Sequence, residues 1–155
     1  MRWLIIRLAG VEFALPLASV REMMQLRGQT LVAVPQCGPF RFRVRVGGAW
    51  LPVGLPHERL GLKARPVGAR SCLVLAEQAK AHELSLRYGF VADSVSRTEQ
   101  FEDADLQRVN PETGEPFPYA LGRLRWNGKW YLALDLDALF PRKDLEAAIR
   151  APSAA

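Results

Sequence analysis

Short apolar runs alternate with polar, glycine and proline positions along most of the chain. Glycine and proline interrupt the pattern every eight to twelve residues, which favours many short strands over long helices. Trp3 to Leu8 forms one apolar run, and Glu12 to Leu17 forms a second after a turn at Gly10-Val11. The pattern predicts that the chain begins with two strands.

Residues 40–46 alternate strictly between apolar and basic side chains. On a strand, the period of two places Phe40, Phe42, Val44 and Val46 on one face and Arg41, Arg43 and Arg45 on the other. Gly47-Gly48 follows, and both residues tolerate the positive φ of a two-residue hairpin turn. Residues 49–53 then return as the second strand of a predicted hairpin.

The second half of the chain repeats this plan. Further strands are predicted over residues 72–76, 84–92, 119–126 and 129–134, the last two joined by Asn127-Gly128, a strong hairpin signal. Asp135 or Asp137 is a suitable N-cap for a short helix that ends before Pro141. An amphipathic helix is predicted from there to about residue 150, and we expect residues 151–155 to be frayed. Its apolar side chains on one side are Leu145, Ala148 and Ile149.

A similar sequence pattern occurs in both halves of the chain. A glycine turn precedes a tryptophan-bearing strand at Gly48 to Val53 and again at Gly128 to Ala133, and a short helical turn is predicted after each. Two small barrels of similar plan produce such a pattern, whereas a solenoid requires a clearer period. The sequence therefore predicts a mainly β protein of two packed barrels, divided near residues 65–70. Trp50 and Trp130 are interpreted as core or barrel-end packing residues.

Charge is distributed unevenly over the 155 residues. The net charge is +5, with +8 in residues 1–70 and −3 in residues 71–155. A basic half is typical of proteins that meet nucleic acid, anionic lipid or an acidic protein surface, but it also fits a solvated arginine-rich face. No apolar run is long enough to span a membrane, and two cysteines, Cys37 and Cys72, are too few for a disulfide scaffold. We expect a cytoplasmic protein without a secretory signal.

The residue types that carry catalysis are not grouped in a recognisable motif. Cys37, Cys72, His57 and His82 are scattered without metal-ligand spacing, so no metal or other cofactor is expected. Neither a nucleophile motif nor a glycine-rich phosphate loop is present. The pair Asp135/Asp137 fits helix capping better than acid–base chemistry. We expect no enzyme, no catalytic residues and no small-molecule substrate.

Arg41, Arg43 and Arg45 are the strongest sign of nucleic-acid binding. Three arginines on one strand face suit a phosphate backbone, and small barrels often bind single strands. Binding of that kind also requires aromatic rings on the same face, and Phe40 and Phe42 point the opposite way. A solvated outer face is the alternative, and nucleic acid remains the second hypothesis.

Four segments in order resemble the CheW-like domain family. Residues 10–23 read GVEFALPLASVREM, which resembles the family's "ALP-x-x-x-V-x-E-hydrophobic" opening, and residues 32–35 read VAVP, similar to its "I-x-x-VP". Residues 88–95 read YGFVADSV, similar to "G-hydrophobic-x-VD-x-V". Residues 119–139 contain YALG, NG and LDLDAL, similar to the family's closing motifs. The resemblance extends over residues 3–140.

The resemblance implies one CheW-like domain over residues 1–150, with two SH3-like five-stranded β-barrels at about 12–68 and 70–140. An N-terminal strand and a C-terminal helix complete it. It also implies a non-catalytic scaffold in a chemosensory array, which couples methyl-accepting chemoreceptors to the regulatory domain of a CheA-type histidine kinase and contacts other CheW-like proteins. Positions matching "V-x-E-hydrophobic" are the expected partner contacts. They are Val20, Arg21, Glu22 and Met23.

The middle of the chain departs from the family's "G-V-x-N-x-RG-x-x-x-PV-x-DL". With Pro52-Val53 aligned, the family's first glycine falls on Phe42, its asparagine on Arg45 and its arginine on Gly47. The family uses that arginine at array contacts, and its loss removes up to five fixed hydrogen-bond donors. The resemblance therefore implies either an ordinary coupler or a divergent one that keeps the receptor contact and has a weakened kinase contact.

Overall fold

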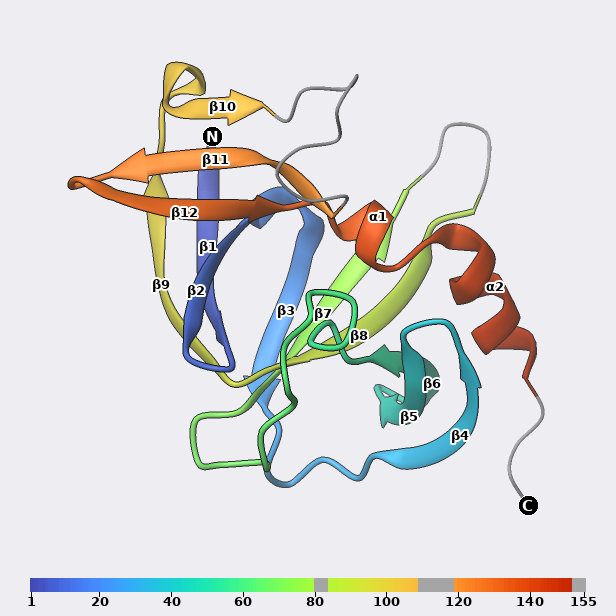
Figure 1. Ribbon diagram of the computed structural model, residues 1–155. Helices are drawn as coiled ribbons and strands as arrows, with labels where there is room; N and C mark the ends of the chain where they lie inside the picture. Colours follow the sequence, from blue (N-terminus) through green and yellow to red (C-terminus); the bar gives the residue numbers. More distant parts are fainter. Residues whose placement is uncertain (80–83, 109–118, 152–155) are drawn as a thin grey trace.

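The computed structural model describes residues 1–79, 84–108 and 119–151, and it is built mainly from β-strands (Figure 1). Twelve strands form two six-stranded sheets, and two short helices follow the last strand. The predicted mainly β class with a short C-terminal helix is confirmed, although each sheet has six strands rather than five. The strands are β1 (Arg2–Leu8), β2 (Val11–Pro16), β3 (Val20–Gln25), β4 (Val32–Cys37), β5 (Phe40–Val46), β6 (Ala49–Gly54), β7 (Cys72–Gln78), β8 (Leu86–Ala92), β9 (Ser94–Gln100), β10 (Leu106–Arg108), β11 (Ala120–Trp126) and β12 (Lys129–Leu134).

The two sheets interleave along the chain. Sheet A has the order β10-β11-β12-β2-β1-β9, and sheet B has the order β3-β7-β8-β6-β5-β4. The first half of the chain therefore gives β1 and β2 to sheet A and the rest to sheet B, while the second half does the reverse. The barrel ranges 12–68 and 70–140 stay a prediction, while the sheets themselves combine strands from both halves of the chain. A local pattern predicts strands, but it does not indicate that β1 pairs with β9 or β3 with β7, because those partners are distant in sequence.

Three of the two-residue turns between antiparallel neighbours have positive φ at both residues. They are Ala9–Gly10, Gly47–Gly48 and Asn127–Gly128, and their six residues have φ between 51° and 82°. Positive φ at both central residues matches the right-handed twist of the flanking strands, which explains the glycines at these positions. The hairpins predicted at Gly47–Gly48 and Asn127–Gly128 are confirmed by the strand registers.

Apolar side chains form a central core between the sheets and a smaller core inside each sheet. The central core includes Phe40, Tyr88, Phe90 and Phe140, whose rings contact one another with centroids 5.1–5.9 Å apart. Phe42 and Leu51 pack against the core inside sheet B. The arginines of β5 therefore lie on the opposite face of the β5–β6 hairpin.

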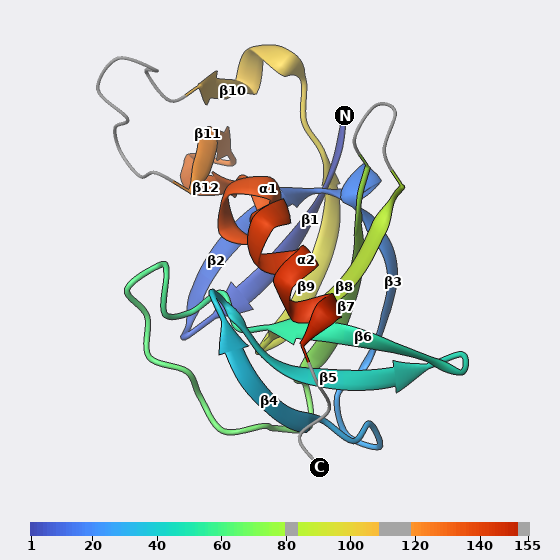
Figure 2. The same ribbon diagram turned by 90° about the vertical axis from the view of Figure 1, so that its right-hand side faces the viewer.

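Helices α1 (Leu136–Leu139) and α2 (Arg142–Arg150) follow β12, and α2 lies against β4, β5 and β6 of sheet B (Figure 2). The carboxylate of Asp135 accepts hydrogen bonds from the backbone amides of Asp137 and Ala138 at 3.1 and 3.2 Å, so Asp135 is the N-cap. Leu145 is fully buried, but Ile149 is 48% exposed and only partly shares the predicted apolar side. Among the described residues, no helix has the length and apolar character needed to cross a membrane. The predicted frayed tail lies, from residue 152 onward, outside the described residues.

Candidate partner-binding surface

The four expected partner contacts lie on β3, at one end of sheet B. Val20 pairs with Ala76 and Glu22 with Leu75, so Arg21 is the extra residue of a β-bulge. Val20 is half-buried and packs against the central core, whereas Met23 is 41% exposed. Because β3 is an edge strand with a bulge, it exposes both charged and apolar side chains to solvent.

Arg21 and Glu22 line a hollow of about 350 Å³ between β3 and the β5–β6 hairpin. We call this hollow the β3 groove. Its apolar floor lies on β5, β6 and β7, and its rim also carries Arg87 and Gly47. The floor residues are Val46, Leu51, Leu75 and Ala76. An apolar floor with charged residues at its rim suits an amphipathic element of a partner protein.

Electrostatic contacts hold Arg21 at the rim of the groove. Its Nε lies 2.6 Å from Oε2 of Glu77, on the neighbouring strand. The pKa of Glu77 is lowered from its ordinary value, first by a hydrogen bond from Ser85 and then by the charges of Arg21 and Arg87. Glu22, in contrast, forms no ion pair with any described residue. The groove therefore presents one neutralised cation and one carboxylate that is open to a partner.

Only one of the three departures from the family pattern lies at this groove. Gly47 is on its rim, with φ of 58° and no atom within 4 Å of the position that its Cβ would occupy. Phe42 packs into the core of sheet B, and Arg45 is exposed on the opposite face of β5. The structure thus brings Gly47 together with Arg21 and Glu22, and it separates Phe42 and Arg45 from them.

The basic face of β5 is less uniform than the sequence indicates. Arg41, Arg43 and Arg45 share one face as predicted, but Arg41 forms an ion pair with Glu58. The guanidinium carbon of Arg43 lies 4.4 Å from the ring centroid of Trp50. The expectation that this face lacks an aromatic ring is therefore wrong. The register across the Gly47–Gly48 turn pairs Arg45 with Trp50, which puts the indole on the arginine face.

The same arrangement occurs on the β11–β12 hairpin. The guanidinium carbons of Arg123 and Arg125 lie 4.9 and 5.4 Å from the ring centroid of Trp130. Both tryptophans are exposed, Trp50 by 46% and Trp130 by 41%, so neither is a core residue. Residues 43–50 and 123–130 read RVRVGGAW and RLRWNGKW, an eight-residue repeat. The similarity between the two halves thus begins five residues before Gly48 and Gly128, at the first arginine of each pair.

Asp93 joins three segments where the two sheets meet. One carboxylate oxygen accepts a hydrogen bond from the backbone amide of Ala9 at 2.5 Å, and the other lies 3.2 Å from Nε2 of His57. His57 is only 2% exposed and lies in the loop after β6. Sequence reasoning missed this role, although Asp93 occupies the aspartate position of the "VD-x-V" motif. These contacts fix the loop after β6 against the β1–β2 turn.

Comparison with known proteins agrees with this architecture. A model of the CheW-like domain family matches residues 2–144. The chemotaxis protein CheW of Rhizobium meliloti (strain 1021) is 30% identical over 146 residues, which cover 92% of this chain and 88% of that protein. The crystal structure of the scaffolding protein TtCheW from Thermoanaerobacter tengcongensis superimposes with a TM-score of 0.75 at 17% identity, over 92% of this chain and 94% of that one. The structural match confirms the expected fold.

Proposed function

The chain belongs to the CheW-like domain family, and from that premise we propose that it is a non-catalytic adaptor of a chemosensory array. In this role it couples methyl-accepting chemoreceptors to a CheA-type histidine kinase in the cytoplasm, alongside other CheW-like proteins. The observation that carries the proposal is the β3 groove, where Arg21 and Glu22 flank an apolar floor. These are the positions that match the family's "V-x-E-hydrophobic" motif.

The β3 groove supports a contact with the receptor tip. A receptor tip is a bundle of amphipathic helices, and its apolar ridge fits a groove with an apolar floor. Unpaired Glu22 offers a carboxylate at the groove to a basic residue of the receptor, and exposed Met23 lies beside it on β3, outside the lining of the groove. Of the four predicted contact residues, Arg21 and Glu22 thus contact the receptor at the groove itself.

Gly47 supports the divergent form of this function. At the rim of the groove it leaves no side chain where the family pattern has arginine, and the nearby Arg21 is committed to Glu77. A guanidinium that already holds one carboxylate is a poor replacement for one that is available to a partner. We propose that the adaptor retains receptor binding and has weakened kinase binding.

Two binding titrations with purified protein at physiological salt test the proposal. One uses a receptor signalling hairpin from the same organism, and the other uses the isolated regulatory domain of the kinase. Glu22→Lys should weaken receptor binding about tenfold or more, since it places a like charge where the partner expects an anion. Arg108→Glu, an exposed charge reversal on sheet A, is the matched control. Receptor binding that Glu22→Lys leaves unchanged contradicts the assignment of β3.

A gain-of-function variant tests the kinase part separately. Gly47→Arg restores the family's side chain, and no atom lies within 4 Å of its Cβ position, although the positive φ costs about 1–2 kcal/mol of stability. Gly47→Asn is the control, because asparagine tolerates that backbone conformation without adding a charge. We expect Gly47→Arg to bind the kinase domain several-fold more tightly than Gly47→Asn. Tight binding by the unaltered protein would instead identify an ordinary coupler.

Nucleic-acid binding is the alternative, and the position of Trp50 beside Arg43 and Arg45 is the one observation that favours it. Arg41 pairs with Glu58 and Arg43 stacks on Trp50, so only a short part of the arginine row suits contact with phosphates. If the alternative is correct, oligonucleotide affinity falls steeply between low and physiological salt. Absent or salt-independent binding removes it.

A further inference from the structure

The two sheets correspond strand by strand. In each sheet, a pair of antiparallel strands carries the arginine–tryptophan repeat, and the returning strand pairs in parallel with the next one: β6 with β8 in sheet B, and β12 with β2 in sheet A. Residues 43–50 are therefore equivalent to residues 123–130, eighty positions later. Because the two faces are equivalent, a segment that covers one of them indicates what type of segment fits the other.

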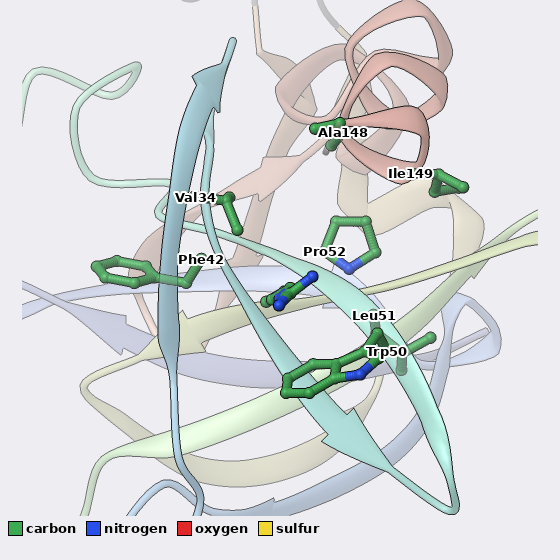
Figure 3. Close-up of a pocket in the computed structure, with 9 residues that line it drawn as sticks. Val34, Phe42, Trp50, Leu51, Pro52, Ala148 and Ile149 are labelled. Atoms are coloured by element: carbon green, nitrogen blue, oxygen red, sulfur yellow. The ribbon is translucent and has the colours of Figure 1, made fainter. Parts of the chain in front are cut away.

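On sheet B, the chain's own helix α2 covers the face beside Trp50. Ala148 and Ile149 of α2 lie above Pro52 and Trp50 of β6, and Val34 of β4 closes the other side (Figure 3). Pro52 is buried although it lies on the arginine face. The space that remains between helix and sheet measures only about 70 Å³. An amphipathic helix is thus a fitting cover for this type of face.

On sheet A, the equivalent face beside Trp130 lacks such a helix among the described residues. A hollow of about 480 Å³ remains, which we call the Trp130 groove. Apolar side chains of β2 and β12 form most of its lining, and the loop after β6 forms one wall. The apolar lining consists of Val11, Phe13, Leu60, Leu62, Trp130 and Leu132.

The wall of the Trp130 groove is held in place by hydrogen bonds. The backbone amide of Leu62 donates to the carbonyl of His57 at 2.8 Å, and His57 is buried against Asp93. The wall therefore keeps its position before any partner binds, which lowers the entropic cost of binding.

The rim of the Trp130 groove is basic. Arg123 lines it, Arg125 stacks on the same indole, and Arg65 lies over the turn beside Val11, 3.1 Å from the Cβ position of Gly10. Lys129 is also near, but Glu12 neutralises it with an ion pair of 2.9 Å. Exposed arginines around an apolar hollow favour an apolar ridge flanked by acidic residues.

We propose that the Trp130 groove is a second docking site, which takes an acidic amphipathic helix of a partner protein. The helix lies on sheet A as α2 lies on sheet B, with its apolar ridge against Phe13 and Leu132 and its carboxylates beside Arg123 and Arg125. The site is separate from the β3 groove, so the proposal does not depend on the proposed function. One adaptor then has two binding faces and can link two elements of an array.

A fluorescein-labelled model peptide tests the docking site. The peptide has about 20 residues, long enough to be helical, with leucines at i, i+3, i+4 and i+7 and glutamates on the flanks of that ridge. A second peptide carries lysines instead of the glutamates. We expect saturable binding of the acidic peptide and at least tenfold weaker binding of the basic one. Equal affinity for both, or no binding of either, overturns the proposal.

Matched variants locate the bound peptide. Trp130→Ala and Arg125→Glu should each weaken acidic-peptide binding about tenfold, while the equivalent changes Trp50→Ala and Arg45→Glu leave it unchanged. All four side chains are exposed, and circular dichroism of each variant verifies the fold. In an NMR titration, the indole N–H signal of Trp130 should move and that of Trp50 should not. Equal losses at both hairpins overturn the proposal.

A single-stranded oligonucleotide is the second probe, because arginine and tryptophan together also suit stacked bases. A thymidine oligonucleotide of about 20 nucleotides should not displace the acidic peptide at physiological salt. Displacement that Trp130→Ala abolishes identifies the face as a nucleic-acid site and overturns the proposal.

Discussion

The hairpins β5–β6 and β11–β12 share an eight-residue pattern but present different surfaces. On β5–β6, Arg41 is tied to Glu58 and helix α2 covers the neighbouring face, leaving about 70 Å³. On β11–β12, two arginines stack on Trp130 beside a hollow of about 480 Å³. The repeat therefore determines the hairpin and the stacking, whereas the segment that follows the returning strand of the other hairpin determines whether the face is closed.

The two segments that follow the returning strands diverge at their first residue. Asp135 caps α1, but the position eighty residues earlier is Leu55, whose side chain has no acceptor for a backbone amide. Residues 56–61 form turns instead of a helix. Phe140 enters the central core, while the equivalent Leu60 is only half-buried at the wall of the Trp130 groove. The capping residue is thus one difference between the helical segment that covers a face and the segment of turns that leaves a face open.

The largest expected effect is the loss of the aromatic side chain that anchors the covering helix. Phe140 is fully buried and contacts the rings of Phe40, Tyr88 and Phe90, so Phe140→Ala should lower the free energy of unfolding by about 3–5 kcal/mol. Leu60→Ala, the equivalent change at the open face, should cost about 1 kcal/mol. Urea unfolding measures both. Similar losses contradict the difference between the two faces.

The next effect concerns the contacts that hold the wall of the open groove. Asp93→Ala removes the acceptor for the Ala9 amide and leaves buried His57 without its partner, which should cost about 2–3 kcal/mol. Glu58→Ala breaks an exposed ion pair and should change stability by less than about 1 kcal/mol. Thermal unfolding of the two variants compares these losses. Acidic-peptide binding by Asp93→Ala should also weaken. Unchanged affinity would show that the wall does not contribute to peptide binding.

The helix cap itself should contribute about 1 kcal/mol. Asp135→Ala removes the acceptor of two backbone amides at the start of α1, whereas Asp135→Asn retains an oxygen acceptor and should cost much less. Chemical denaturation measures the difference. Hydrogen exchange should also rise in α2 of Asp135→Ala, since α1 positions that helix over sheet B. Equal stability of the alanine and asparagine variants argues against the cap.

The smallest effect is a pH dependence from the Glu12–Lys129 pair of sheet A, which has no equivalent on the β5–β6 hairpin. The pKa of Glu12 is lowered from its ordinary value of 4.5, first by the hydrogen bond from Lys129 and then by the charges of Lys129 and Arg97. The position equivalent to Lys129 on sheet B is Ala49. A lowered carboxyl pKa adds stability above the unfolded-state pKa, and this stability is lost as pH falls through the folded-state pKa.

Glu12→Gln isolates that contribution. Between pH 7 and pH 3, the unaltered protein should lose more stability than Glu12→Gln, by up to about 1 kcal/mol. Urea unfolding at the two pH values measures the losses. An equal loss in both proteins shows that other carboxylates account for the acid sensitivity.

Local sequence predicted those features that a few neighbouring residues determine. The turns at Gly47–Gly48 and Asn127–Gly128 depend on two positive φ values, and the cap at Asp135 depends on one side chain, so all three were predictable. The alternation over residues 40–46 likewise placed the arginines on one face.

Features that depend on distant pairings were not predictable in this way. Which sheet receives β1 or β7 depends on partners far along the chain, so the composition of each sheet could not be read from local pattern. Trp50 joins the arginine face only through the register across the turn, and Gly47 reaches Arg21 only because β3 and the β5–β6 hairpin border one hollow. Family motifs identified β3 as a contact strand, but they did not indicate the Trp130 groove.

The central claim, an adaptor that keeps receptor binding but recruits the kinase weakly, is tested most directly by a competition assay. Receptor-coupled kinase activity is measured in a reconstituted array with an ordinary coupling protein while this protein is added in excess. The account predicts that kinase activity falls, because receptor sites become occupied by an adaptor that does not hold the kinase well. A rise in kinase activity, as an ordinary coupler produces, would contradict it.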